Sequence, residues 1–420
     1  MTSTPEAPRP PTADPARVRS LDGLRGVAAL VVVVHHALQL DPAFARVQGD
    51  LSADGEAAWV WALTHTPLHV LWAGEEAVLV FFVLSGFVLA LPATRHAIRW
   101  SGYYPRRLVR LYLPVWGSLL LAVALKGAID RPARVESPWL GERSDVPLQE
   151  VWHDAALLDG TGFLNSPLWS LRWEVVFSIA LPAYLLAFRR RSAQRTGWDA
   201  LGVMALIGIG TLASAPAIRY LPVFALGVLL AHNQDRLAAA TARLDAHRFA
   251  RALWALTAVA VASLLTARWL VAGLPVRHPV LDAAASAATI AGAAAAVVLA
   301  LRWTPCARGL DRGATQWLGA RSFSLYLVHE PVVVAAALLL PPAWGAWPAA
   351  AVGVVLALAV SALFYVTVER PSITLSRRAG RWPRASGVRR DATLRIGRFG
   401  EDEAGRAPRG ARPDRGADAA

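Results

Sequence analysis

A histidine pair near the end of a long apolar segment is the feature of this sequence best suited to chemistry. The stretch Leu21 to His36 is long enough to enter a bilayer, yet it contains Asp22, Arg25, His35 and His36. A charged side chain at membrane depth costs roughly 2.5–3.5 kcal/mol, so such residues usually face a polar interior. Arg25 and His36 are about three helical turns apart and share one face, whereas His35 points about 100° away. The spacing predicts that His36 acts with Arg25 and Asp22; the alternative is a capped helix start with a passively buried histidine.

A group of arginines begins a later apolar segment. Arg106, Arg107 and Arg110 follow a pair of tyrosines, and Arg107 and Arg110 are three residues apart on one helix face. Arginine suits phosphate because its planar guanidinium donates two parallel hydrogen bonds. The same residues also fit simple anchoring at the cytoplasmic end of a span. The residues alone leave both interpretations open.

A carboxylate also lies inside an apolar segment. Glu174 is placed a turn or two into the segment 168–188, where an unpaired charge would be costly. We therefore expect a partner, either Arg172 or an imidazole from another helix. A direct pair with Arg172 is disfavoured, because residues two apart do not face each other on a helix.

Two further polar patterns occur within apolar segments. Ser322, Tyr326 and His329 follow spacings of four and three residues and predict one polar helix face. This face indicates either a site or a hydrogen-bonded packing stripe. Ser85 and Gly86 lie in the stretch FFVLSGF and are typical of close helix packing.

The elements that hold these residues are predicted to be membrane helices. The chain has 420 residues, 55% of them hydrophobic, and a mean hydropathy of +0.38, which is unlike an ordinary soluble protein. We expect an all-α, polytopic transmembrane bundle of about ten spans, at 21–40, 74–93, 106–128, 168–188, 200–215, 217–232, 252–272, 280–301, 317–340 and 346–368. Both termini are expected to be cytoplasmic, because the arginine-rich loops then lie on one side of the membrane, namely 94–107, 189–198, 233–251 and 302–316.

The two ends of the chain differ from the segments between them. Residues 1–20 are predicted to be a disordered cytoplasmic lead, 21–371 the membrane domain, and 372–420 a disordered basic cytoplasmic tail. The net charge of +13 is explained by contact with anionic lipids, and no nucleic-acid partner is expected. With one cysteine and widely spread histidines, no metal site is expected either.

Several of these motifs occur together in the order found in the acyltransferase-3 family of bacterial membrane acyltransferases. They are LDGLRG with the histidine pair, FFVLSGF, the paired arginines and YLVHEP, and the chain resembles the family over about residues 20–371. The resemblance maps the family's functional positions onto Arg25, His36, Arg107, Arg110 and Glu174. One position departs from the pattern: Leu79 stands where the family usually has an aspartate, and Glu75 and Glu76 lie upstream of it.

The resemblance implies a membrane O-acyltransferase, of enzyme class EC 2.3.1, in the bacterial plasma membrane. It would move an acyl group, expected to be acetyl, from cytoplasmic acyl-CoA to a hydroxyl of a glycan, a lipid-linked sugar or a glycosylated metabolite. The expected catalytic residues are His36, Glu174 and Arg25, with His36 as the base and Glu174 supporting it. CoA phosphates would be bound by Arg106, Arg107 and Arg110. The acceptor-side or supporting residues would be His329, Tyr326, Asp22 and Ser85.

A transporter or flippase is the alternative class. In that case the buried arginine, histidine and glutamate residues would form a proton or substrate path. Within the acyltransferase interpretation, His36 could act as a base or could carry the acyl group itself, and the sequence does not choose between them.

Overall fold

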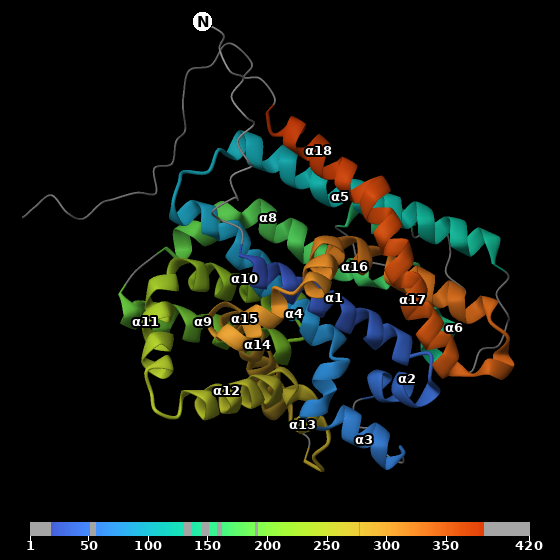
Figure 1. Cartoon of the computed structure of the whole chain (residues 1–420), viewed down its shortest axis with the longest axis horizontal. Coiled ribbons are helices and arrows are strands. Elements are labelled where there is room, and N and C mark those ends of the chain that lie inside the picture. Colours follow the sequence, from blue (N-terminus) through green and yellow to red (C-terminus); the bar gives the residue numbers. More distant parts are fainter. Residues whose placement is uncertain are drawn as a thin grey trace, which may run out of the picture.

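The chain folds as an assembly of helices. The structure, a computed structural model, describes residues 18–50, 56–129, 137–144, 151–157, 162–189, 192–276 and 278–381. These residues form α-helices joined by short turns and contain no strand (Figure 1). The all-α prediction is therefore confirmed for the described part of the chain.

Seven helical segments of the described residues are long and apolar enough to cross a membrane. They are built on α1 (Arg19–Leu38), α4 (Gly74–Ala90), α5 (Trp100–Ala128), α8 (Trp169–Ala187), α14 (Pro279–Arg302), α16 (Gly313–Leu339) and α17 (Ala346–Phe364). Three of the ten expected spans are not among them, namely α9 (Ala193–Leu212) and the shorter helices α10 (Pro216–His232) and α12 (Ala250–Leu265). These long apolar segments indicate that the chain is a multi-pass membrane protein.

Shorter helices connect or cover the long ones. They are α2 (Pro42–Gly49), α3 (Ala58–Thr64), α6 (Pro138–Ser144), α7 (Val151–Ala156), α11 (Gln234–Asp245), α13 (Ala267–Ala272) and α15 (Thr304–Leu310). Helix α6 belongs to the segment between the third and fourth expected spans, and it contributes directly to the site described below.

The end of the membrane domain continues as helix rather than as a disordered tail. Helix α17 passes through a π-helical stretch, Tyr365–Glu369, into α18 (Arg370–Ala379). The serines Ser372 and Ser376, four residues apart, are buried on one face of α18, so this face packs despite its polar composition. The prediction of disorder from residue 372 is wrong for 372–379. Residues 1–17 and 382–420 of the two expected disordered ends lie outside the described residues.

Helices α1 and α16 run parallel and pack very closely, which brings two polar segments together. A Cβ atom on Gly26 would lie 2.5 Å from the backbone nitrogen of Gly319, and one on Gly319 would lie 2.2 Å from the carbonyl oxygen of Asp22. Glycine allows this approach because it has no side chain. Ten residues further along both helices, His36 meets His329. The glycine contact thus sets the register that pairs the two histidines.

A second close contact joins α4 to α10. A Cβ atom on Gly227 would lie 2.1 Å from the carbonyl oxygen of Val83, so Gly227→Ala forces the two backbones apart. Overpacking of this kind costs about 1–3 kcal/mol. We expect a lower midpoint of thermal unfolding for the detergent-purified variant. Gly202→Ala in α9 is the control, because no atom lies within 4 Å of its added Cβ; equal losses in both variants would contradict the close packing.

Candidate active site

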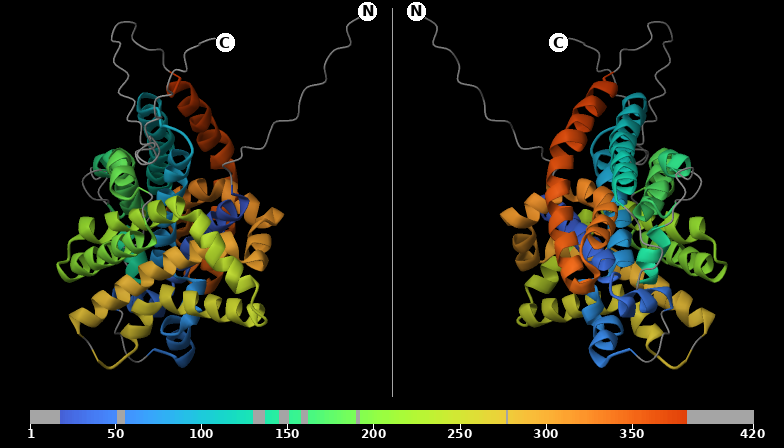
Figure 2. Two further views of the ribbon diagram at one scale, coloured as in Figure 1. Left: turned by 90° about the vertical axis from the view of Figure 1, so that its left-hand side faces the viewer. Right: turned by 90° about the vertical axis from the view of Figure 1, so that its right-hand side faces the viewer.

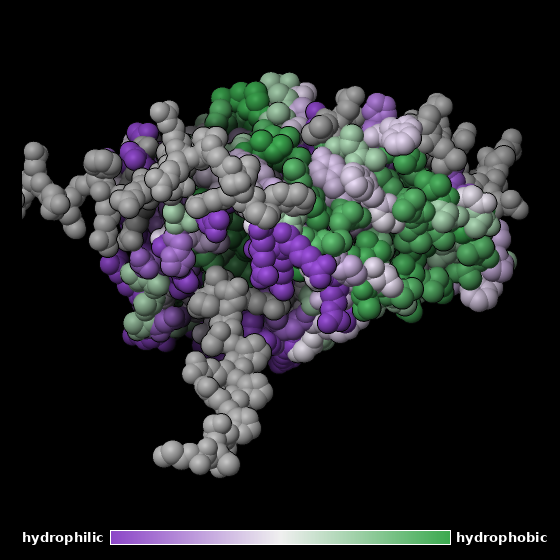
Figure 3. Space-filling model, turned by 90° about the horizontal axis from the view of Figure 1, so that it is seen from above, coloured by the Kyte–Doolittle hydropathy of each residue, from purple (hydrophilic) through white to green (hydrophobic). Residues whose placement is uncertain are grey.

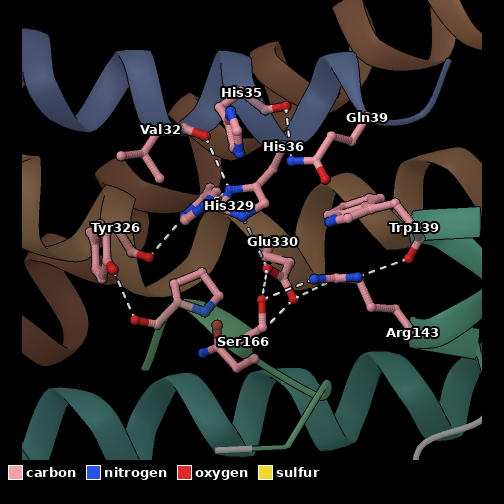
Figure 4. Close-up of polar contacts among 12 residues, drawn as sticks. Val32, His35, His36, Gln39, Trp139, Arg143, Ser166, Tyr326, His329 and Glu330 are labelled. Carbon is pink, nitrogen blue, oxygen red and sulfur yellow. Dashed lines mark hydrogen bonds and ion pairs between the residues drawn. The ribbon is translucent and has the colours of Figure 1, made fainter. Parts of the chain in front are cut away.

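His36 faces a cavity of about 490 Å³ at the C-terminal end of α1. We name it the histidine cavity; its lining includes His36, Gln39, Trp139, Arg143, Trp169 and Tyr220. The His36 side chain is 15% exposed, so it is held by protein on most sides and open to the cavity on one. Figure 4 shows it pointing away from α1 toward residues of α16 and α6.

His329 of α16 lies directly behind His36. Its Nε2 is 2.9 Å from Nδ1 of His36, and its Nδ1 is 2.8 Å and 3.1 Å from the carbonyl oxygens of Tyr326 and Leu325. Carbonyl oxygens only accept hydrogen bonds, which assigns the proton of His329 to Nδ1. Neutral His329 then accepts at Nε2 from Nδ1–H of His36. This leaves Nε2 of His36 with a free lone pair, which is the state required of a general base.

A buried carboxylate completes this group. Oε2 of Glu330 lies 3.6 Å from Nε2 of His36, and the residue is 1% exposed. It accepts hydrogen bonds from Arg143 Nε at 3.0 Å and from the backbone N–H and hydroxyl of Ser166 at 3.1 Å and 2.6 Å. These contacts fix the position of the Glu330 carboxylate. The carboxylate can therefore stabilise the positive charge that His36 gains on taking up a proton, and it does not have to move to do so.

Glu330 and Arg143 are the functional candidates that sequence reasoning missed. Glu330 follows His329 directly in an apolar segment, so the cost of an unpaired carboxylate, applied to Glu174, could have found it. Its partner Arg143 comes from α6, and the guanidinium also lies 4.3 Å from the Trp139 ring. No helical periodicity links α6 to α16, so the pair could not be inferred from spacing.

His35 is held in a different environment from His36. It is 6% exposed, its Nδ1 is 2.9 Å from the carbonyl oxygen of Trp72, and its ring stacks on that residue. His35 is also one of the residues that line the histidine cavity. The two adjacent histidines therefore have separate sets of partners, and only His36 contacts His329 and Glu330.

A second cavity, of about 800 Å³, lies nearer the first turns of α1 and α5. We name it the arginine cavity, because its lining includes Arg25, Arg106, Arg107, Arg110, Arg370 and Arg377. Asp22 and Ser85 line it as well. The structure thus places Arg25 and Asp22 with the α5 arginines and not beside His36.

Glu174 also belongs to the arginine cavity. It forms an ion pair with Nη2 of Arg107 and accepts a hydrogen bond from Ser85 at 3.0 Å. The expected partners were Arg172 or an imidazole; Arg172 instead lies over the Trp173 ring, at 5.1 Å. Packing of α8 against α5 and α4, which the sequence did not reveal, gives Glu174 these partners. The carboxylate beside His36 is Glu330.

Several arginines of this cavity form no close ion pair, although the carboxylates of Asp22 and Glu369 line the same cavity and interact with Arg25 and Arg110 electrostatically. Nε of Arg25 is buried without a hydrogen-bond partner. Neither Arg106 nor Arg110 forms a hydrogen bond or ion pair with the residues that the structure describes. Arg106 is exposed, whereas Arg25 and Arg110 are partly buried, and burying a guanidinium without a hydrogen-bond partner is costly. The arrangement therefore favours an anionic ligand in this cavity.

Tyr326 lies between the two cavities and lines both. Its hydroxyl donates to the carbonyl oxygen of Pro167 at 2.8 Å and lies 2.7 Å from the hydroxyl of Ser170. Ser170 lines the arginine cavity and Pro167 the histidine cavity. The contact between α16 and the start of α8 therefore forms the wall that separates them.

The position of Leu79, where an acid was expected, is part of the apolar core. Leu79 is 1% exposed, whereas Glu75, one turn upstream, lines the histidine cavity. The Glu75 carboxylate pairs with Arg219 at 3.2 Å and Arg268 at 2.6 Å. Among the described residues, no group of three or more histidine, cysteine, aspartate or glutamate side chains could hold a metal ion.

Comparison with known proteins identifies the family of the chain. The profile of the acyltransferase-3 family, described as an acyltransferase domain, matches residues 18–366. The chain is 30% identical over 193 residues to Acyltransferase MdmB from Streptomyces mycarofaciens, a match that covers 46% of this chain and 45% of that protein. No solved structure matches. Because the family profile spans most of the chain, the protein belongs to the acyltransferase-3 family.

Proposed function

We propose that this protein is a membrane O-acyltransferase with His36 as its general base and acyl-CoA as its donor. The observation that carries the proposal is the free Nε2 of His36, oriented by His329 and backed by Glu330 at the edge of a cavity. Glu174, expected from the sequence to support His36, is assigned instead to fixing Arg107.

The proposed reaction follows from the proton positions at His36. An acceptor hydroxyl in the histidine cavity gives its proton to Nε2 while its oxygen attacks the thioester carbonyl carbon. The resulting imidazolium is stabilised by the carboxylate of Glu330. The tetrahedral intermediate then expels the CoA thiolate, which takes the proton back from His36. The products are an ester and free CoA, and His36 returns to its starting state.

The lining of the histidine cavity supports a glycan or glycosylated acceptor. The aromatic faces of Trp139, Trp169 and Tyr220 line it together with the amide side chains of Gln39 and Gln48. Aromatic faces beside a few polar groups suit a ring that carries both C–H groups and hydroxyls. The donor phosphates would lie in the arginine cavity, and the acyl group, which we expect to be acetyl, would reach His36 past Tyr326.

Substitutions at His36 and Glu330 test the catalytic assignment. We expect His36→Gln to lower the rate of acetyl transfer by about 10²–10⁴-fold, because a positioned base contributes this much. Glu330→Gln should lower the rate while acetyl-CoA binding is retained. The assay is release of free CoA from acetyl-CoA by purified protein, with octyl glucoside as the hydroxyl acceptor.

His232→Gln is the matched control for this experiment. His232 lies at the end of α10 and, like His36, contacts the carbonyl oxygen four residues earlier, at 2.9 Å. It lines neither cavity, so its loss should leave the rate unchanged. Full activity of His36→Gln would rule out the proposed base.

The donor site is tested most cleanly at Arg110, because this arginine forms no hydrogen bond or ion pair with the described residues that its loss would break. Losing one charge-assisted contact to phosphate should cost about 1.5–3 kcal/mol, or roughly ten- to hundredfold in acetyl-CoA affinity. Arg110→Lys should recover part of the loss. The exposed Arg251→Ala in α12 is the control. Unchanged affinity of Arg110→Ala, measured by calorimetry, would mean that Arg110 is only an anchor.

We also propose that both termini are cytoplasmic in the bacterial plasma membrane, which places the arginine cavity toward the cytoplasm. The positive-inside rule supports this orientation. Single cysteines introduced at residues 95 and 345 of a Cys306→Ala protein should be labelled from opposite sides in intact cells. Residue 345 should react with an impermeant maleimide and residue 95 should not. The reverse pattern would contradict the orientation.

A further inference from the structure

Helix α18 lies beyond the residues matched by the family profile, which end at residue 366. It lies beside α5 on one side of the bundle, as both views in Figure 2 show. Between the ends of these helices is a third cavity, of about 620 Å³. We name it the α18 cavity; the arginines that line it are Arg99, Arg106, Arg107, Arg110, Arg377 and Arg381.

The charges of the α18 cavity are only partly balanced by protein groups, since Arg107 is paired with Glu174 from outside its lining. Among the described residues, the lining itself contains no aspartate or glutamate. Arg377 of α18, like Arg106 and Arg110, forms no hydrogen bond or ion pair with the described part of the chain. Several like charges held together repel one another unless an anion lies between them. In Figure 3 the face that carries α5 and α18 shows a hydrophilic strip beside a broad hydrophobic area.

Backbone contact holds the two sets of arginines opposite each other. A Cβ atom on Gly102 of α5 would lie 2.7 Å from the carbonyl oxygen of Gly380, and one on Gly380 would lie 3.3 Å from Cβ of Arg106. The buried serines of α18 fix the same face along the helix. Arg377 and Arg106, both exposed to solvent, therefore line one cavity from two packed helices.

The α18 cavity continues the arginine cavity. Arg106, Arg107, Arg110 and Arg377 line both. Of these two cavities, the arginine cavity reaches Tyr326, which also lines the histidine cavity, and the α18 cavity does not. Acyl-CoA carries its thioester at one end and two separate phosphate groups, the diphosphate and the ribose 3′-phosphate, toward the other. With the acyl end at Tyr326, the nucleotide end lies toward α18.

We infer that Arg377, with Arg106, binds the ribose 3′-phosphate of the donor and makes the enzyme selective for acyl-CoA over its 3′-dephospho form. This inference rests on the proposed function, because it takes acyl-CoA as the donor. A phosphomonoester dianion suits the site, since two guanidinium groups from different helices can each donate to it.

The test compares acetyl-CoA with acetyl-3′-dephospho-CoA in the full-length protein. The wild-type KM should be about tenfold or more lower for acetyl-CoA, the effect of roughly one charge-assisted contact. Arg377→Gln should raise the KM for acetyl-CoA about tenfold while kcat and the KM for the dephospho donor stay unchanged. Arg377→Lys should restore part of the preference. Arg378→Gln, the exposed neighbour that lines neither cavity, should behave as wild type.

Binding of adenosine 3′,5′-bisphosphate, measured by calorimetry, separates this inference from the proposed function. Binding that depends on Arg377 supports the inference even if no acetyl transfer is found, in which case the proposed reaction alone fails. An equal rise in KM for both donors in Arg377→Gln would overturn the inference, because the arginine would then not contact the 3′-phosphate. A change in KM that Arg377→Gln causes only in vesicles containing phosphatidylglycerol, and equally for both donors, would mean that Arg377 binds a lipid headgroup. This result would also overturn the inference.

Discussion

Every ionisable side chain inside an apolar helical bundle must be paired with a protein group or must face water or a ligand. This constraint explains most of the polar interior of the protein. Glu330 is paired with Arg143, Glu174 with Arg107, and Glu75 with Arg219 and Arg268. Within the described residues, this pairing leaves Nε2 of His36 open to a cavity and several arginines without a hydrogen bond or ion pair. The unpaired groups mark where substrates would bind.

The parallel packing of α1 and α16 determines how these groups are spaced. One end of the contact is a glycine-to-backbone approach at Gly26 and Gly319, and the other is the pair formed by His36 and His329. A shift of either helix by one residue would turn a histidine away from its partner by about 100°. The geometry of the His36–His329 pair therefore depends on glycines that have no reactive side chain and that lie about two to three turns away.

The helical fold and the importance of α1 could be predicted from sequence, because hydropathy and helical spacing are local signals. The pairs between helices could not. Glu174 was expected to support His36, but α8 packs on α5 and Glu174 forms an ion pair with Arg107 instead. The carboxylate beside His36 is that of Glu330 in α16. Arg143 comes from a short helix between expected spans, where no pattern indicates a buried position. Composition predicted disorder from residue 372, because the segment is rich in arginine, glycine, alanine and aspartate and has almost no large apolar residues. The two buried serines of α18 and its contact with α5 show that a narrow polar face can still pack.

The wall formed by Tyr326 and Ser170 has a consequence for the cell as well as for the reaction. With the proposed orientation, the two cavities open toward opposite sides of the membrane, and a continuous passage between them would let ions and protons leak and dissipate the membrane gradient. The hydrogen bonds of Tyr326 to Ser170 and Pro167 hold the wall in place while the two cavities share a lining residue. On the proposed mechanism, only the small acyl group has to cross that barrier, so modification on one side can draw on metabolism on the other without opening a pore.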